Sequence, residues 1–163
     1  MDIRAESAGD RDAIYHLTEI AFAPMPFSAG NEADCINRLR ADGDLTLSLV
    51  AVEAGELVGH IAFSPVKLNG LADNWYGLGP VSALPGRQRT GIGSALIEHG
   101  LDQIRALGAH GCILIGDPAY YSRFGFRADG RVTYRDLPSE LVQWLAFGSQ
   151  TPSGVLTFSP GLE

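Results

Sequence analysis

Apolar residues near the start of the chain recur at helical spacing on either side of a break. Residues 3–5 predict a short strand, and Ser7 or Asp10 can cap a helix that ends at Phe22. Two prolines and a glycine then interrupt the pattern before a second helix at residues 31–41. The apolar stripe of the first helix comprises Ala13, Ile14, Leu17, Ile20 and Ala21.

From Leu45 onward the apolar positions alternate with polar ones, which is the period of a strand. Turn residues at 54–55 and 69–70 divide the region into a strand from Leu45, a partner at residues 57–66 and a third strand at residues 75–83. We therefore expect an antiparallel meander.

The third strand contains Gly79 and Pro80. Proline lacks the N–H group that a strand ladder needs, and glycine tolerates irregular torsions, so the pair predicts a bulge.

A second helical pattern follows at residues 91–107, with Gly108 placed to end it, and residues 111–115 form a short apolar run. A strand, a helix and a strand in this order form a crossover unit, so the strands at 75–83 and 111–115 should be parallel neighbours at least at one end. The apolar stripe of this helix is Ile92, Leu96, Ile97, Leu101, Ile104 and Leu107.

The last part of the chain is less regular. We expect a short helix at residues 119–124, a helical or turn-like segment at residues 139–146 and a final strand at residues 155–158. No repeat or linker divides the sequence, so residues 1–163 are expected to form a single domain.

Composition excludes several classes of function. With 45% apolar and 19% charged residues the chain is typical of globular domains, and its net charge of −7 disfavours binding to a nucleic acid backbone. Cys35 and Cys112 have neither zinc-ligand nor CxxC spacing, and His16, His99 and His110 are scattered, so we assign no metal site. No apolar run suits a leader or a membrane span, which favours the cytoplasm and no membrane partner.

The most informative segment is residues 81–97, where a strand leads through a cationic turn into a helix that begins at Gly91 and Gly93. The amides at a helix N-terminus lack intrahelical partners and lie at the positive end of the helix dipole, so they suit a phosphate group. Arg87 and Arg89 add positive charge. The alternative is a glycine-rich turn that only starts a helix.

Two other phosphate-binding motifs fit this segment poorly. A dinucleotide-binding fingerprint needs a small residue where this chain has Leu96. A P-loop needs a Gly-Lys-Ser/Thr sequence that is missing here.

Residues 88–93 (Gln-Arg-Thr-Gly-Ile-Gly), placed after residues 81–85, resemble the acetyl-CoA-binding motif of the GCN5-related N-acetyltransferase (GNAT) superfamily. Residues 117–126 resemble a later motif of that family, in which a tyrosine precedes a Gly-Phe pair. The sequences of both motifs are most similar to those of the YhbS-like branch of the family, and the resemblance covers residues 3–128.

The resemblance implies an α/β (α+β) fold with a mixed, mostly antiparallel sheet, splayed parallel central strands and flanking helices. It implies that backbone groups of Val81, Ser82 and Ala83 pair with pantetheine and that the Ala83 amide stabilises the oxyanion. The amides that would hold the pyrophosphate of acetyl-CoA, the co-substrate, are those of Arg89, Thr90, Gly91, Ile92, Gly93 and Ser94.

Tyr121 occupies the family's general-acid position, five residues before Phe126, and Tyr120 is the neighbouring alternative. A tyrosine with a pKa of about 10 stays protonated at neutral pH and can donate to a thiolate whose acid has a pKa of ~8.5. The competing interpretation is that both rings are core contacts.

The general base is harder to identify, because residues 75–83 contain no Asp or Glu, whereas many relatives carry a carboxylate near these strands. His60 titrates in a suitable range and is one candidate, although a buried histidine with a purely structural partner is the alternative. Asp73 and Glu32 are weaker candidates, since exposed carboxylates are common on surfaces.

The resemblance implies direct transfer of an acetyl group from acetyl-CoA to a small-molecule or peptide amine in a ternary complex. A non-catalytic acyl-CoA-binding module and a transferase for longer acyl chains stay open as alternatives. The acceptor has no recognisable sequence code, and homodimerisation is open because some relatives form dimers.

Overall fold

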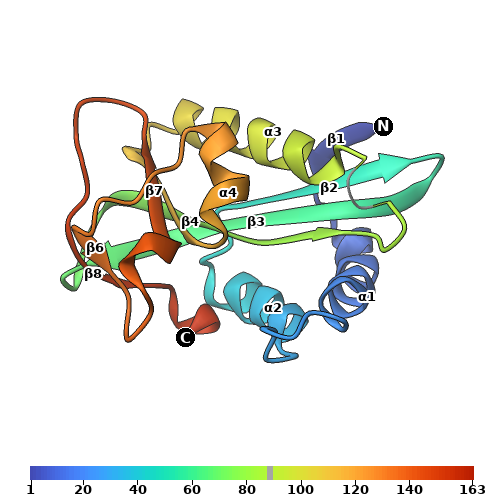
Figure 1. Ribbon diagram of the computed structural model, residues 1–163. Helices are drawn as coiled ribbons and strands as arrows, with labels where there is room; N and C mark the ends of the chain where they lie inside the picture. Colours follow the sequence, from blue (N-terminus) through green and yellow to red (C-terminus); the bar gives the residue numbers. More distant parts are fainter. Residues whose placement is uncertain (88–89) are drawn as a thin grey trace.

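The computed structural model describes residues 1–87 and 90–163, in which strands in the order β1-β2-β3-β4-β5-β7 form the main path of one sheet (Figure 1). Neighbours on this path are antiparallel except β4 and β5, which are parallel. β8 pairs with β3 and β6. The strands are β1 (Asp2–Ala5), β2 (Leu47–Glu53), β3 (Glu56–Leu68), β4 (Leu71–Ala83), β5 (Gly111–Ile115), β6 (Val132–Thr133), β7 (Val142–Ala146) and β8 (Gly154–Thr157).

Helices cover both faces of the sheet. In Figure 1, α3 lies over one face, and α1 and α2 lie against the other. The α-helices are α1 (Arg11–Phe22), α2 (Glu32–Asp42), α3 (Ile92–Ala106) and α4 (Pro118–Tyr121), with 3₁₀ turns η1 (Ala8–Asp10), η2 (Ser122–Phe124), η3 (Ser139–Leu141) and η4 (Pro160–Leu162). The expected mixed α/β fold with flanking helices and a parallel central pair is confirmed.

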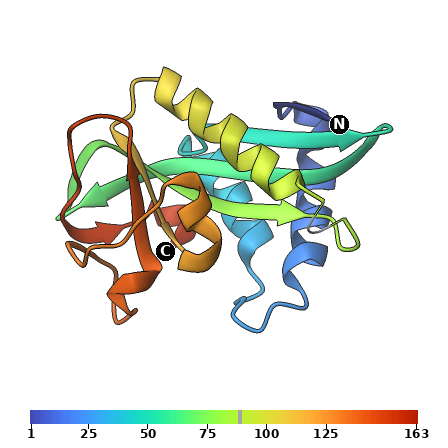
Figure 2. The ribbon, with the colours of Figure 1, turned by 45° about the horizontal axis from the view of Figure 1, so that its top comes forward.

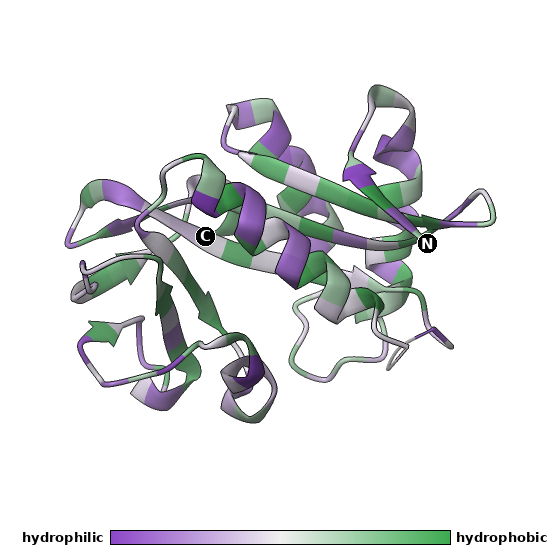
Figure 3. Cartoon of the chain, turned by 90° about the horizontal axis from the view of Figure 1, so that it is seen from above, coloured by the Kyte–Doolittle hydropathy of each residue, from purple (hydrophilic) through white to green (hydrophobic). Residues whose placement is uncertain are grey.

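α3 crosses the strands diagonally (Figure 2). Hydrophilic and hydrophobic residues alternate along the helix itself (Figure 3). Its predicted stripe is buried except at Leu107, which caps the helix and is 62% exposed. Gly59 and Gly100 let this helix approach β3 closely. A Cβ atom at Gly59 would lie 2.6 Å from Ile92 Cγ2, and one at Gly100 would lie 2.3 Å from Phe63 Cε1.

The contact face of α1 differs from the predicted stripe at two positions. Ala13 and Ile20 are exposed, Ile20 by 50%. Thr18 is buried instead, and its hydroxyl donates to the carbonyl of Ile14 at 2.7 Å. Because a threonine can satisfy its hydroxyl within the helix, a polar residue occupies a position on the buried face here.

β3 and β4 are longer than predicted. β3 passes through Pro65 to Leu68, with a shift of register between Pro65 and Lys67, and β4 begins at Leu71. An irregularity in the ladder accommodates a residue without an N–H group, so proline does not end this strand. The predicted bulge in β4 is confirmed, because the register shifts between the pairs Phe63–Leu78 and Ile61–Val81.

The prediction of a helical or turn-like segment at residues 139–146 is confirmed only as far as Leu141 and is wrong beyond it. η3 occupies only Ser139–Leu141, after which β7 pairs along its whole length with β5. Trp144, 2% exposed, lies opposite Ile113 in this pairing. A short apolar run does not distinguish a helix from a strand, and here the edge of β5 decided the outcome.

None of the helices within residues 1–87 and 90–163 combines the length and the apolar character that crossing a membrane requires.

The close packing of α3 on β3 yields a stability prediction. We expect Gly100→Ala to lower the free energy of unfolding by about 1–3 kcal/mol, because the new methyl group overlaps the buried ring of Phe63. Urea unfolding measures the change. Gly148→Ala is the control, since a Cβ atom there meets nothing within 4 Å. Equal stabilities of the two variants would show that β3 and α3 are not tightly packed.

Candidate functional site

The parallel strands β4 and β5 pair over only three residues each, Trp75–Gly77 with Gly111–Ile113. In the part of the chain that the structure describes, the rest of β4 has no strand partner on the β5 side. In Figure 1, β7, the partner of β5, runs at a steep angle to β2 and β3. The two central strands therefore diverge after Gly77, next to the bulge at Gly79 and Pro80.

Backbone groups of Val81 and Ala83 face this open edge of β4. The Leu84 N–H donates to the Val58 carbonyl of β3 at 2.9 Å. Hydrogen bonding alternates along an antiparallel pair, so Ser82 also turns its N–H and C=O toward β3, where it lies opposite His60. Val81 and Ala83 then present theirs on the other side. This geometry does not support the predicted backbone role of Ser82. The side chain of Ser82 points, like that of its partner His60, to the sheet face that α1 and α2 cover.

The N-terminus of α3 lies beside the end of β4, because Gly59, the register partner of Ala83, packs against Ile92. Gly91 caps the helix with a φ of 89°, so a residue without a side chain suits this position. Amides at the start of a helix lack intrahelical acceptors, which leaves those of Ile92, Gly93 and Ser94 available. Arg89 lies outside the described residues. Arg87 forms an ion pair with Glu53 at 3.1 Å, so its charge is partly neutralised.

The two adjacent tyrosines of α4 have different surroundings. The Tyr120 hydroxyl lies 3.4 Å from Ser94 Oγ in the first turn of α3, and the Arg123 guanidinium stacks on the Tyr120 ring. The Tyr121 ring packs over Gly116, just beyond β5. Burial, together with Tyr120, raises the pKa of Tyr121 to about 12, so its hydroxyl is protonated at neutral pH.

The start of α4 is defined by residues next to it in the sequence. The Asp117 side chain accepts from the Ala119 amide at 3.0 Å, and Pro118 occupies the first turn. These signals position Tyr120 and Tyr121 between the end of β5 and α3.

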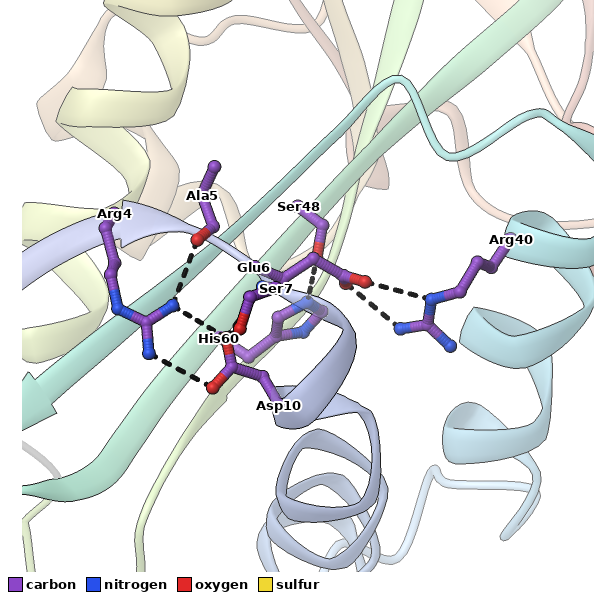
Figure 4. Close-up of polar contacts among 8 residues, drawn as sticks. All are labelled: Arg4, Ala5, Glu6, Ser7, Asp10, Arg40, Ser48 and His60. Atoms are coloured by element: carbon purple, nitrogen blue, oxygen red, sulfur yellow. Dashed lines mark hydrogen bonds and ion pairs between the residues drawn. The ribbon is translucent and has the colours of Figure 1, made fainter.

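His60 lies on β3, on the sheet face that α1 and α2 cover, and is completely buried. Its Nε2 is 2.8 Å from Ser48 Oγ, which in turn contacts Glu6 (Figure 4). Burial lowers the pKa of His60 to about 4, which the negative charge of Glu6 only partly offsets. His60 is therefore neutral at pH 7, one strand away from the open edge of β4.

The weaker carboxylate candidates lie elsewhere. Asp73 is near the start of β4 and its carboxylate is 3.9 Å from His110. Glu32 opens α2 and accepts from Ser28 at 2.6 Å. Within residues 1–87 and 90–163, no three His, Cys, Asp or Glu side chains converge in a way that would hold a metal ion.

Sequence reasoning missed the residues that surround His60. Glu6, Arg40 and Ser48 belong to three separate segments, and for Ser82 the sequence predicted only a backbone contact with pantetheine. The one available signal was Ser48 among the apolar residues of β2 that precede Glu53, because a serine needs a partner when it is buried.

Comparison with known proteins gives a consistent set of relatives. The model of the "Acetyltransferase (GNAT) family" matches residues 12–126. The N-acetyltransferase YhbS of Escherichia coli strain K12 is 40% identical over 101 residues, which cover 61% of this chain. The match covers 60% of that relative, so the chain spans about three-fifths of its length.

Two solved structures share the fold over almost the entire chain. A GNAT family acetyltransferase from Brucella melitensis, in complex with acetyl-CoA, is 46% identical with a TM-score of 0.90, covering 99% of this chain and 97% of that one. YhbS from Escherichia coli, in complex with CoA, is 29% identical with a TM-score of 0.89, covering 99% and 91% respectively.

The buried state of His60 predicts how stability depends on pH. Below its ordinary pKa of 6.5 the unfolded chain binds a proton at His60, whereas the folded protein does so only near pH 4. Stability should therefore fall as the pH drops from 6.5 toward 4, by on the order of 3 kcal/mol in total. Burial alone would raise the pKa of Glu6, but Arg40 and Ser48 together lower it from 4.5, so the stability that Glu6 contributes is lost only as the pH falls through about 4.5 and below.

Urea unfolding at about pH 7 and about pH 5 measures this slope. His60→Gln is the matched variant, because its amide can still bond to Ser48 but does not titrate. A flatter dependence in the variant is expected. Parallel curves for the two proteins would show that His60 does not titrate abnormally.

Proposed function

The chain belongs to the acetyltransferase (GNAT) family, and from this membership we propose that residues 1–163 act as one domain that transfers an acetyl group from acetyl-CoA to an acceptor amine. The observation that carries the proposal is the divergence of β4 from β5 beside the N-terminus of α3. Both relatives with near-complete coverage hold acetyl-CoA or CoA, which supports the same ligand here.

The pantetheine arm suits the open edge of β4. Its two amide groups can pair with the outward N–H and C=O groups of Val81 and Ala83, as an added strand would. On this arrangement the arm continues toward the start of α3, where the amides of Ile92, Gly93 and Ser94 meet the pyrophosphate. Thr90 and Gly91 complete the turn, and Arg89 would add its charge.

We place the reacting carbonyl at the Val81 end of this edge, because the arm continues past Ala83 toward the start of α3. The amine nitrogen attacks the thioester carbon, the C–N bond forms, and the carbonyl oxygen becomes an oxyanion that a free backbone amide of this edge stabilises. The Val81 amide is nearer to this end than the Ala83 amide that the resemblance implies. When the C–S bond breaks, one proton from the nitrogen ends on the thiolate, so the products are an amide and free CoA.

Direct transfer fits the state of Cys112. This thiol is fully buried in β5, and burial raises its pKa well above the usual range, so it does not supply a thiolate nucleophile. An acyl-enzyme at this cysteine is therefore disfavoured.

Tyr121 is our choice for the residue that assists the leaving sulfur. With a pKa near 12 its hydroxyl keeps its proton, whereas a thiol has a pKa of about 8.5. Complete proton transfer from Tyr121 is thus unfavourable, and hydrogen-bond donation to the developing thiolate is its main contribution. The Tyr120 hydroxyl, directed to Ser94, belongs to the phosphate end.

His60 is our choice for the proton acceptor. Once the C–N bond has formed, the positively charged nitrogen is far more acidic than the free ammonium, so a neutral histidine of low pKa can accept its proton. The proton then passes to the thiolate.

One observation favours a second function, a non-catalytic acyl-CoA-binding module. The stretch from Trp75 to Ala83 contains no carboxylate that could act as a base. A panel of primary amines separates the two functions: spermidine, L-lysine, an aminoglycoside and a peptide with a free amino terminus. Thiol release with any of them supports the enzyme, and tight binding of acetyl-CoA without release supports the module.

Binding can be tested at Gly93. Gly93→Val should weaken acetyl-CoA binding at least about tenfold, because the side chain would crowd the pyrophosphate. The fold should tolerate it, since the nearest atom to a Cβ there is the Tyr120 hydroxyl at 3.5 Å. Isothermal titration calorimetry measures the affinity, with His99→Val, on the exposed side of the same helix, as control. Unchanged affinity in both variants contradicts the assignment.

Tyr121→Phe tests the role of the hydroxyl. We expect kcat to fall roughly 10–100-fold with the KM for acetyl-CoA unchanged, because the interaction develops only as the sulfur leaves. Tyr134→Phe is the control, since Tyr134 also has a pKa raised to about 12 by burial but bonds to Glu163. Thiol release with the fastest amine of the panel is the measurement. An unchanged kcat removes Tyr121 from the mechanism.

A further inference from the structure

A row of polar side chains runs from Arg40 on α2 to His60 on β3 (Figure 4). Arg40 on α2 holds Glu6, just after β1, with Nε and Nη2 each 3.0 Å from a carboxylate oxygen. Glu6 contacts the Ser48 hydroxyl of β2, and Ser48 Oγ lies 2.8 Å from Nε2 of His60. Four separate segments of the chain therefore meet in one network.

The direction of each hydrogen bond in this row follows from the charge on Glu6. Burial would raise the pKa of Glu6, but Arg40 and Ser48 together lower it, so the carboxylate is ionised and only accepts. The single proton of Ser48 must then point to Glu6. Ser48 Oγ can only accept from His60, which places the proton of His60 on Nε2 and leaves a lone pair on Nδ1.

That lone pair has no partner within the described structure, and neither has the Ser82 hydroxyl. Both groups are buried, His60 completely and Ser82 to 2% exposure. They are direct neighbours across β3 and β4, where side chains start roughly 5 Å apart. A buried acceptor without a donor is unfavourable, so this pair calls for a bridging donor, and one water molecule can bond to both groups.

Ser82 connects this pair to the site described above. It stands between Val81 and Ala83, whose backbone groups face the open edge of β4. A water held by His60 and Ser82 therefore lies within one strand of the reacting thioester.

We propose that Arg40, Glu6 and Ser48 fix the tautomer of His60, and that His60 and Ser82 hold a water through which His60 takes the proton from the attacking nitrogen. The inference rests on the proposed function. Once the C–N bond has formed, the water gives a proton to Nδ1 and receives one from the positively charged nitrogen. When the C–S bond breaks, the proton on Nδ1 returns through the water to the thiolate, and His60 regains its starting tautomer.

The same network stabilises the transient imidazolium. The negative charge of Glu6 favours the charged form of His60, although burial opposes it. Glu6, Ser48 and Arg40 thus act through His60 as positioning residues, and Ser82 positions the water.

The tautomer can be tested without any substrate. Long-range ¹H–¹⁵N NMR of the labelled protein should show the His60 ring protonated at Nε2, with the signal assigned by its loss in His60→Gln. Ser48→Ala should give a mixture of tautomers, because the carboxylate no longer orders the hydroxyl. A ring protonated at Nδ1 overturns the proposal.

Kinetics test the water. With acetyl-CoA and the fastest amine of the panel, Ser82→Ala and Ser48→Ala should each lower kcat roughly tenfold or more while the KM for acetyl-CoA stays constant. Ser64→Ala is the matched control and should keep the wild-type kcat, because Ser64 is also a buried serine of this sheet without a bonding partner in the structure described. Equal losses in Ser64→Ala, or none in Ser82→Ala, overturn the proposal.

The outcome separates this inference from the function on which it rests. If the wild-type protein binds no acetyl-CoA or releases no thiol with any amine of the panel, the proposed function fails, and the NMR result alone decides the tautomer. If the wild type turns over and Ser82→Ala is equally fast, the acetyltransferase stands and the role of the water falls.

Discussion

The separation of β4 from β5 after Gly77 is the constraint on which the rest of the site depends. β4 carries a bulge at Gly79 and Pro80 directly after its last pair with β5, while its ladder with β3 continues to Ala83. The strand therefore keeps one partner and loses the other. Its unpaired edge is a row of oriented N–H and C=O groups, which in a continuous sheet would be hydrogen-bonded to a neighbouring strand.

The position of α3 depends on how closely a helix can approach this sheet. Gly59 and Gly100 remove the side chains that would separate α3 from β3, and Gly91 permits the turn that starts the helix. The free amides of its first turn consequently lie next in the chain after the open edge of β4. One extended and one helical segment thus offer donors to different parts of the same ligand.

On the opposite face of the sheet, a completely buried histidine lies near a partly buried carboxylate. Arg40 and Ser48 keep Glu6 ionised, and His60 stays neutral. A buried polar row of this kind is stable only when nearly every donor and acceptor is used. In the described part of the chain, Nδ1 of His60 and the hydroxyl of its neighbour Ser82 have no bonding partner, so a function is to be sought where the row ends.

The sequence by itself determined the order of the elements from β1 to α4, the bulge in β4 and the glycine-rich start of α3, because these depend on local periodicity and on the torsions of glycine and proline. It did not determine β7, since a short apolar run can become a strand when it meets the free edge of another strand. It also did not determine that the backbone groups of Ser82 face β3 and not the open edge of β4, since this depends on the register of the two strands. The network of Glu6, Arg40, Ser48 and His60 also required the folded chain. Residues distant in sequence share hydrogen bonds only when several strands and a helix are packed together, and no local pattern encodes that.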